Sequence, residues 1–350
     1  MIAARGKLRA LAVSPLLVGL FVIPEAARAA SVPEYEFATP VFGLATAPDG
    51  SLLVADAGAG IVELRKGKGM LIVELPGVTD MAPRGRGSMW AVTGGGEDDT
   101  AGTLFRVSHG KTRALADLIA FEAQVNPDED DIESNPFDVA ALSGGKALVA
   151  DAAGNDLLVV DQRGKVDWVA TLPEELVSTQ DIKDLVGCPN PPPEFEEICD
   201  LPPMLPADPV PTGVTIGPDG AYYVGELKGF PAPRNESRVW RIEPGTRHAK
   251  CGESPACTVV ADGFTSIIDL NIGPDGTIYV TEFDEASWFA IEIGDGIGGT
   301  VNACNPSSWS CTEVGTGLPM SIASTVGKDG TVYAAIKVLI PGEAEVIPLT

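Results

Sequence analysis

The stretch from residue 213 to residue 226 reads GVTIGPDGAYYVGE, and it decides the fold. An apolar run leads into the turn Pro218-Asp219-Gly220, and a run rich in β-branched and aromatic residues follows the turn. Asp-Gly pairs accept the positive φ that tight hairpin turns require. The stretch therefore predicts a β-hairpin of two short antiparallel strands.

The same hairpin pattern recurs along the chain. Residues 43–56 (GLATAPDGSLLVAD) and 269–282 (DLNIGPDGTIYVTE) align with it without a gap, and looser copies occupy 138–151, 322–332 and 80–92. Two further short apolar runs usually follow each copy. Four antiparallel strands repeated six times predict an all-β protein, a six-bladed β-propeller.

The repeats also set the expected boundaries of one propeller domain over residues 30–350. The six blades are expected at about 41–77, 78–120, 135–173, 211–263, 264–317 and 318–350. The last blade has only about three strands before the chain ends, so we expect residues 34–39 to supply its outer strand. Such closure would remove exposed sheet edges.

The net charge narrows the range of partners. The 350 residues include 24 Lys and Arg against 49 Asp and Glu, which gives a formal charge of −25. A chain of this charge repels phosphate backbones, so nucleic acid is excluded as an expected partner. We expect a monomer whose partner is an exported protein or a small ligand.

The first 29 residues have the pattern of an export signal. Arg5, Lys7 and Arg9 precede a short apolar run, and Ala27-Arg28-Ala29 is typical of a cleavage site. No other run is apolar and long enough to span a bilayer. We expect a secreted or periplasmic protein.

Six cysteines fit that compartment. Their spacing predicts three local disulfides, Cys188 with Cys199, Cys251 with Cys257 and Cys304 with Cys311. A zinc site is the competing interpretation, although no C-x-x-C pair is present. Disulfides would leave no thiol to act as a nucleophile.

Essentially the whole mature chain resembles a known family, and the resemblance is specific in blades three to five. Residues 211–231, the segment from Asn135-Pro136-Phe137 to Leu158, and Gly263-Phe264-Thr265 resemble the ScyD/ScyE family of exported bacterial proteins. The resemblance implies a propeller related to the NHL-repeat type, mostly without an assigned activity. The cysteine pairs and a Pro-rich acidic insertion depart from the family pattern.

Catalytic groups are scarce. His109 and His248 are the only histidines, and both lie in polar turns, so His-dependent triads and His-bound zinc or copper lose their key residue. No phosphate-binding glycine loop occurs either. No catalytic residue can be assigned from the sequence.

Acidic residues recur where the second strand of each repeat ends. Asp56, Asp151, Glu226 and Glu282 occupy four of these six positions, and propeller symmetry maps equivalent positions to one circle. Asn135 and Asp138 belong to the same face. Oxygen-rich sites suit Ca²⁺, so these carboxylates are candidate calcium ligands. The alternative is that each carboxylate accepts hydrogen bonds within its own turn and serves only the structure.

The insertion at residues 174–210 is Pro-rich and acidic, and it joins blades three and four. It is either a lid or docking arm, or a solvated loop tied by its disulfide. The sequence favours a non-catalytic exported propeller that binds a ligand or protein partner through its loop-rich face. The alternative function is a calcium-dependent hydrolase or lactonase that uses channel carboxylates.

Overall fold

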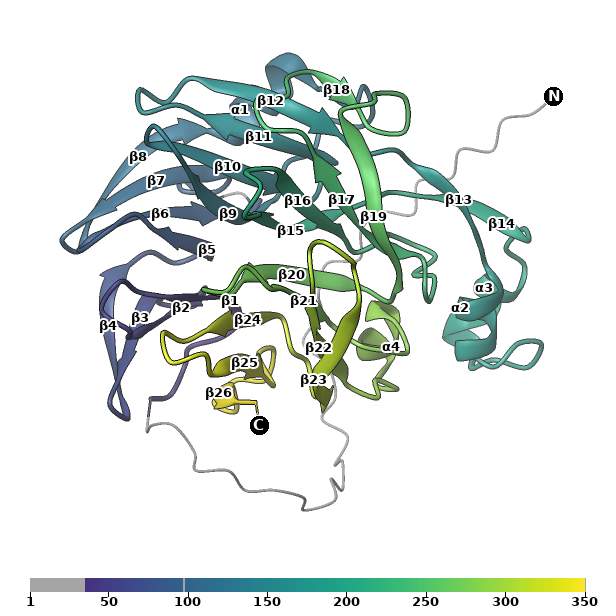
Figure 1. Ribbon diagram of the computed structural model, residues 1–350. Coiled ribbons are helices and arrows are strands. Elements are labelled where there is room, and N and C mark those ends of the chain that lie inside the picture. Colours follow the sequence, from purple (N-terminus) through teal and green to yellow (C-terminus); the bar gives the residue numbers. More distant parts are fainter. Residues whose placement is uncertain (1–34, 97, 350) are drawn as a thin grey trace.

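The computed structural model describes residues 35–96 and 98–349, whose six largest sheets lie around a central axis (Figure 1). Each of these six sheets is one blade, and most blades have four strands. The six-bladed propeller expected from the hairpin repeats is confirmed. The expected export signal at residues 1–29 lies outside the described residues.

The strands of the blades follow the chain order. Blade one contains β1 (Val41–Thr46), β2 (Leu52–Asp56), β3 (Gly60–Arg65) and β4 (Lys68–Glu74). Blade two contains β5 (Val78–Pro83), β6 (Ser88–Thr93), β7 (Thr103–Ser108) and β8 (Lys111–Asp117). Blade three contains β9 (Pro136–Leu142), β10 (Lys146–Asp151), β11 (Asp156–Val160) and β12 (Val166–Thr171).

Blade four contains β15 (Pro211–Ile216), β16 (Tyr222–Glu226), β17 (Ser237–Ile242) and β19 (Cys257–Phe264). Blade five contains β20 (Ile267–Ile272), β21 (Ile278–Glu282), β22 (Gly299–Cys304) and β23 (Cys311–Leu318). Blade six contains β24 (Ala323–Val326), β25 (Val332–Ile336) and β26 (Glu345–Pro348). The short strand β18 (Ala249–Lys250) belongs to a blade-four hairpin and pairs in parallel with β12 of blade three.

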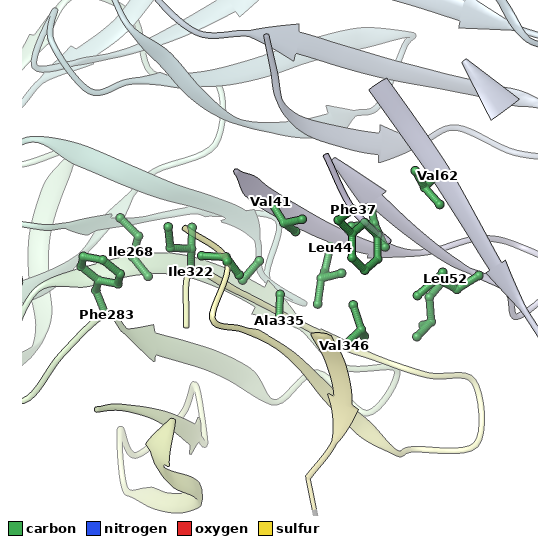
Figure 2. Packing of buried hydrophobic residues seen from close by; sticks show 14 residues of the cluster. Phe37, Val41, Leu44, Leu52, Val62, Ile268, Phe283, Ile322, Ala335 and Val346 are labelled. Carbon is green, nitrogen blue, oxygen red and sulfur yellow. The ribbon is translucent and has the colours of Figure 1, made fainter. Parts of the chain in front are cut away.

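Apolar side chains fill the spaces between neighbouring blades. Figure 2 shows the cluster where the first and last blades meet, with Leu44 and Leu52 on one side and Ala335 and Val346 on the other. The strands alternate in side-chain direction, so each sheet presents one apolar face to each neighbour. The ring is held together by these contacts between sheets.

The ring closes differently from the prediction. Blade six has three strands, and residues 35–39, the described part of the expected strand 34–39, do not pair with it. Phe37 is instead buried between the first and last blades (Figure 2). The amide of Ala38 donates to Asp56 Oδ2 at 2.7 Å. The segment packs as a wedge, and burying the Phe37 ring between the blades removes apolar surface from water and stabilises the seam.

One face of the ring carries the long connections, and we call it the loop-rich face. The turns between the second and third strands open there, as do the connections between blades. They include α1 (Leu118–Val125) before blade three and α4 (Trp288–Ile293) in blade five. The opposite face carries shorter turns, including the Asp-Gly turns of the repeat.

The insertion between blades three and four forms an arm at the side of the ring (Figure 1). It contains β13 (Glu175–Ser178) paired with β14 (Met204–Ala207), together with α2 (Gln180–Leu185), η1 (Pro193–Phe195) and α3 (Glu196–Cys199). Ile182 of α2 and Val186, just after it, are buried against Ala232 and against Phe289 of α4. The arm is therefore docked on the loops of blades four and five.

All three disulfides form in the pairs that the spacing predicts. Cys188–Cys199 ties the arm, and Cys251–Cys257 and Cys304–Cys311 tie hairpins of blades four and five. Three disulfides suggest an extracytoplasmic compartment. None of the helices in the described part of the chain is long and apolar enough to cross a membrane.

Candidate functional site

The four carboxylates of the predicted circle are buried, and each is already engaged near its own blade. Asp56 accepts from the amides of Ala38 and Gly58. Glu282 accepts from the amide of Thr265 and, at 2.7 Å, from Asn302 Nδ2. Among the described residues, no three of these four carboxylates have oxygens within 4.8 Å of one another.

Glu226 belongs to a buried ion-pair network that reaches the arm. Its Oε1 lies 3.1 Å from Lys228 Nζ and 2.9 Å from Arg238 Nε, and both cations also contact Glu175 of the arm at 2.7 Å. Trp240 Nε1 donates to Glu226 Oε2. Burial outweighs these cations and raises the pKa of Glu226 to about 7. The network fixes the base of the arm to blade four.

Three aspartates line the axis of the ring. Asp80, Asp138 and Asp269 occupy equivalent positions on the innermost strands β5, β9 and β20. Each accepts a hydrogen bond from the innermost strand of the following blade, from the amides of Val139 (3.1 Å), Val214 (2.5 Å) and Ser324 (2.9 Å) respectively. We call them the channel aspartates.

Burial and mutual repulsion raise the pKa of the channel aspartates. Desolvation is the main cause for all three, and Asp138 adds to the rise for both Asp80 and Asp269. The pKa of Asp138 itself rises to about 6, with hydrogen bonds opposing the effect of burial. Burial and the neighbouring carboxylate thus favour the protonated form of Asp80.

The loop-rich end of blade three concentrates further acids. Asp151 closes β10 and accepts from the amide of Asn135 (2.6 Å), from Ser134 Oγ (2.6 Å) and from the amide of Gly154 (3.1 Å). Asp156 lies opposite Asp151 in the strand register, at the start of β11. Glu122 comes from α1 and is 2% exposed. Three buried carboxylates thus gather beneath the loop at residues 126–134.

Above them lies an exposed acidic rim, which we define by the residues Asp128, Glu129, Asp130, Asp131, Glu133, Glu174 and Asp208. Within the described residues, Asp130, Glu174 and Asp208 are the only three acidic side chains with oxygens all within 4.8 Å of one another. The pKa of Asp208 is raised by partial burial and by the neighbouring rim acids. Among the described residues, one cation pairs with a rim acid: Lys250 Nζ lies 3.0 Å from Glu129 Oε1.

Sequence reasoning identified Asp138, Asp151 and Asn135 but missed Asp80, Asp269, Glu122 and Asp156. The signal for the channel aspartates was present, because Gly43, Asp80, Asp138, Gly213 and Asp269 each begin one copy of the repeat. Glu122 gave no such signal, since helix α1 falls between two blades. The two histidines lie in outer hairpins, as expected, and His248 contacts Asp167 at 2.7 Å.

Comparisons with known proteins support the fold. No family model and no curated protein matches the chain. A Bacteroides thetaiotaomicron protein of unknown function has a similar structure, with 10% identity, a TM-score of 0.58 and coverage of 91% of this chain and 71% of that chain.

Two enzymes are similar at the same level. The PQQ-bound aldose sugar dehydrogenase of Streptomyces coelicolor has 12% identity, a TM-score of 0.56 and coverage of 91% of this chain and 96% of that chain. A gluconolactonase of Xanthomonas campestris has 11% identity, a TM-score of 0.52 and coverage of 90% and 88%. At such identities the likeness concerns the fold alone, and this fold carries several different chemistries. The chain is a six-bladed β-propeller whose family the comparisons leave unnamed.

Proposed function

We propose that this chain is a secreted or periplasmic binding protein that holds a positively charged partner on its acidic rim. The observation that carries the proposal is the rim itself. Seven carboxylates gather there, and Lys250 is the one cation that pairs with any of them in the described part of the chain. Such a surface attracts cations over a distance and favours them as partners.

The arm supports a binding role. Glu174 and Asp208 lie at the two ends of the arm where it leaves and rejoins the ring, so the arm contributes two of the rim acids. The buried network around Lys228 and the disulfide Cys188–Cys199 hold the arm in place. A fixed arm reduces the entropy lost when a partner binds.

The test measures the affinity of the protein for a nona-lysine peptide, the cationic probe, by calorimetry. Binding should weaken as the salt rises from about 10 mM to about 150 mM, because the Debye length shortens from about 30 Å to about 8 Å. The double variant Asp130→Asn with Asp131→Asn should weaken binding about fivefold at low salt, since each exposed pair contributes about 0.2–1 kcal/mol.

The matched control is Glu253→Gln with Glu313→Gln, which removes the same charge from exposed positions in outer hairpins of blades four and five. It should bind the peptide almost as the wild type does. Equal losses in both variants would show that only the net charge matters. Absence of binding at low salt would contradict the proposal outright.

A second function is favoured by the channel aspartates. The pKa of Asp138 is raised to about 6, and a carboxyl with such a pKa is suited to general acid and base catalysis. The gluconolactonase with a similar fold makes a sugar lactone the first substrate to try. Turnover of an aldonolactone panel with Ca²⁺ present, lowered by Asp138→Asn, would support a calcium-dependent lactonase. A panel left unhydrolysed by the wild type would remove this alternative.

A further inference from the structure

We propose that Glu122 and Asp156 bind a hard divalent cation of the Ca²⁺ class, in a buried site at the loop-rich end of blade three. The site differs from the predicted circle, of which only Asp151 lies nearby. It is also separate from the acidic rim, which is exposed. The inference goes beyond the proposed function and does not depend on it.

The first observation is that the carboxylate of Asp156 is buried without a hydrogen-bond donor among the described residues. Its side chain is completely buried, and neither carboxylate oxygen has a hydrogen-bond donor within the described part of the chain. A buried carboxylate without a donor or a counter-ion is strongly destabilising. Every carboxylate of the predicted circle, by contrast, has donors. Asp156 therefore lacks the partner that its surroundings require.

Glu122 repeats this pattern from a different element. It is 2% exposed, and its Oε1 also has no donor among the described residues. Gly154 lies between Glu122 and Asp151, because a Cβ added to it would lie 3.5 Å from Glu122 Oε2 and 3.5 Å from Asp151 Oδ1. Helix α1 and the end of strand β10 thus direct these two carboxylates toward one small region.

The acids at and beside this end of blade three are Glu122, Asp128, Asp151 and Asp156. No ion pair in the described part of the chain involves any of these four acids. A bound cation would neutralise the cluster.

The donor chemistry selects the kind of cation. Asn126, one helical turn after Glu122, has a buried Oδ1 that also lacks a donor. Two carboxylates and an amide oxygen, with backbone carbonyls and water to complete the shell, match the oxygen ligands of Ca²⁺. The described residues around the site contribute neither thiolate nor imidazole, the ligands that zinc and copper favour.

Asp128 connects this site to the surface. Its Oδ2 accepts from Asn155 Nδ2 at 3.1 Å, just before Asp156 in the chain, and its charge acts on both Glu122 and Asp208. Asp128 is thus a rim acid whose charge also acts on the buried site, and it favours the approach of a cation.

The experiment measures Ca²⁺ binding by calorimetry, and melting with Ca²⁺ or EDTA, at about pH 8, above the pKa of Glu122. The test variant is Glu122→Gln with Asp156→Asn. It should weaken Ca²⁺ binding at least about tenfold, since even outer-shell partners of metal sites contribute 10–100-fold. The same variant without metal should melt at or above the wild-type temperature, because two buried charges have been removed.

The matched control is Glu174→Gln with Asp208→Asn, which removes the same two charges from the exposed group of three acids. It should keep Ca²⁺ binding within a few-fold of the wild type. Loss of binding in this control with retention in the test variant would place the cation on the rim and overturn the inference. A wild-type melting temperature indifferent to Ca²⁺ and EDTA would overturn it as well, and would mean that the buried carboxyls are simply protonated.

Discussion

Replacing Lys228 by methionine tests the buried network that holds the arm. Lys228 is completely buried, and its ammonium lies 2.7 Å from Glu175 Oε2 and 3.1 Å from Glu226 Oε1. Removing one partner of a buried ion pair typically costs about 3–5 kcal/mol, because the other charge is left without compensation. Arg238 still contacts both glutamates, so we expect a loss near the lower end, about 3 kcal/mol.

The loss should depend on pH. Burial raises the folded-state pKa of Glu226 to about 7 from 4.5, so this group favours the folded state most below pH 4.5, and that contribution is lost as the pH rises through 7. Without Lys228 the pKa of Glu226 rises further. The deficit of the variant should therefore be larger at about pH 8 than at about pH 5, where Glu226 is protonated in both proteins.

Urea unfolding followed by tryptophan fluorescence at both pH values measures the effect. Lys250→Met is the control, since Lys250 pairs with Glu129 at 3.0 Å but the two side chains are 47% and 74% exposed. It should cost less than about 1 kcal/mol. If Lys228→Met costs no more than this control, or costs the same at both pH values, the argument for a buried charged network fails.

Three further predictions concern the whole ring, its seam and the arm. The wild type should lose stability as the pH rises from about 5 to about 8. The reason is that the pKa values of Glu122, Glu226 and Glu282 are raised to about 7 and that of Asp138 to about 6. A melting temperature that rises with pH over this range would contradict this prediction. Phe37→Ala should lower the free energy of unfolding in urea by about 3–5 kcal/mol. A variant that unfolds at the same urea midpoint as the wild type would show that the wedge contributes little. Cys188→Ser with Cys199→Ser should speed proteolysis within residues 180–203 by loosening the arm, whereas Cys251→Ser with Cys257→Ser should not. Equal proteolysis rates in the two variants would contradict a local role for the Cys188–Cys199 disulfide.

The sequence predicted the blades well because their signals are local. An Asp-Gly turn between two alternating runs needs no distant contact, and the same holds for cysteines six or seven residues apart. The prediction of a closing strand at residues 34–39 was wrong because the burial of Phe37 depends on Leu64 and Val346, which only the closed ring brings together. Strand propensity alone does not include that contact.

The candidate site was harder to predict for the same reason. Asp80 and Asp138 meet across 58 positions of sequence, and Lys228 contacts Glu175 across 53. Glu122 comes from α1, between blades two and three, and meets the acids of blade three only in the folded ring. Pattern reasoning identified the positions that repeat, but the unpaired carboxylates became visible only with the neighbours that surround them.

The channel position has a consequence for how such a protein can evolve by duplicating blades. Asp80, Asp138 and Asp269 each bind the blade that follows, whereas Gly43 and Gly213 stand where an added Cβ would come within 2.4 Å and 2.6 Å of the next blade's atoms. A blade that begins with aspartate must be followed by a blade whose innermost strand has a backbone amide positioned to donate a hydrogen bond to that carboxylate. A blade that begins with glycine requires a neighbour that approaches closely. The copies look interchangeable in sequence, yet each has become specific to its place, so exchanging two blades would break the ring at several seams.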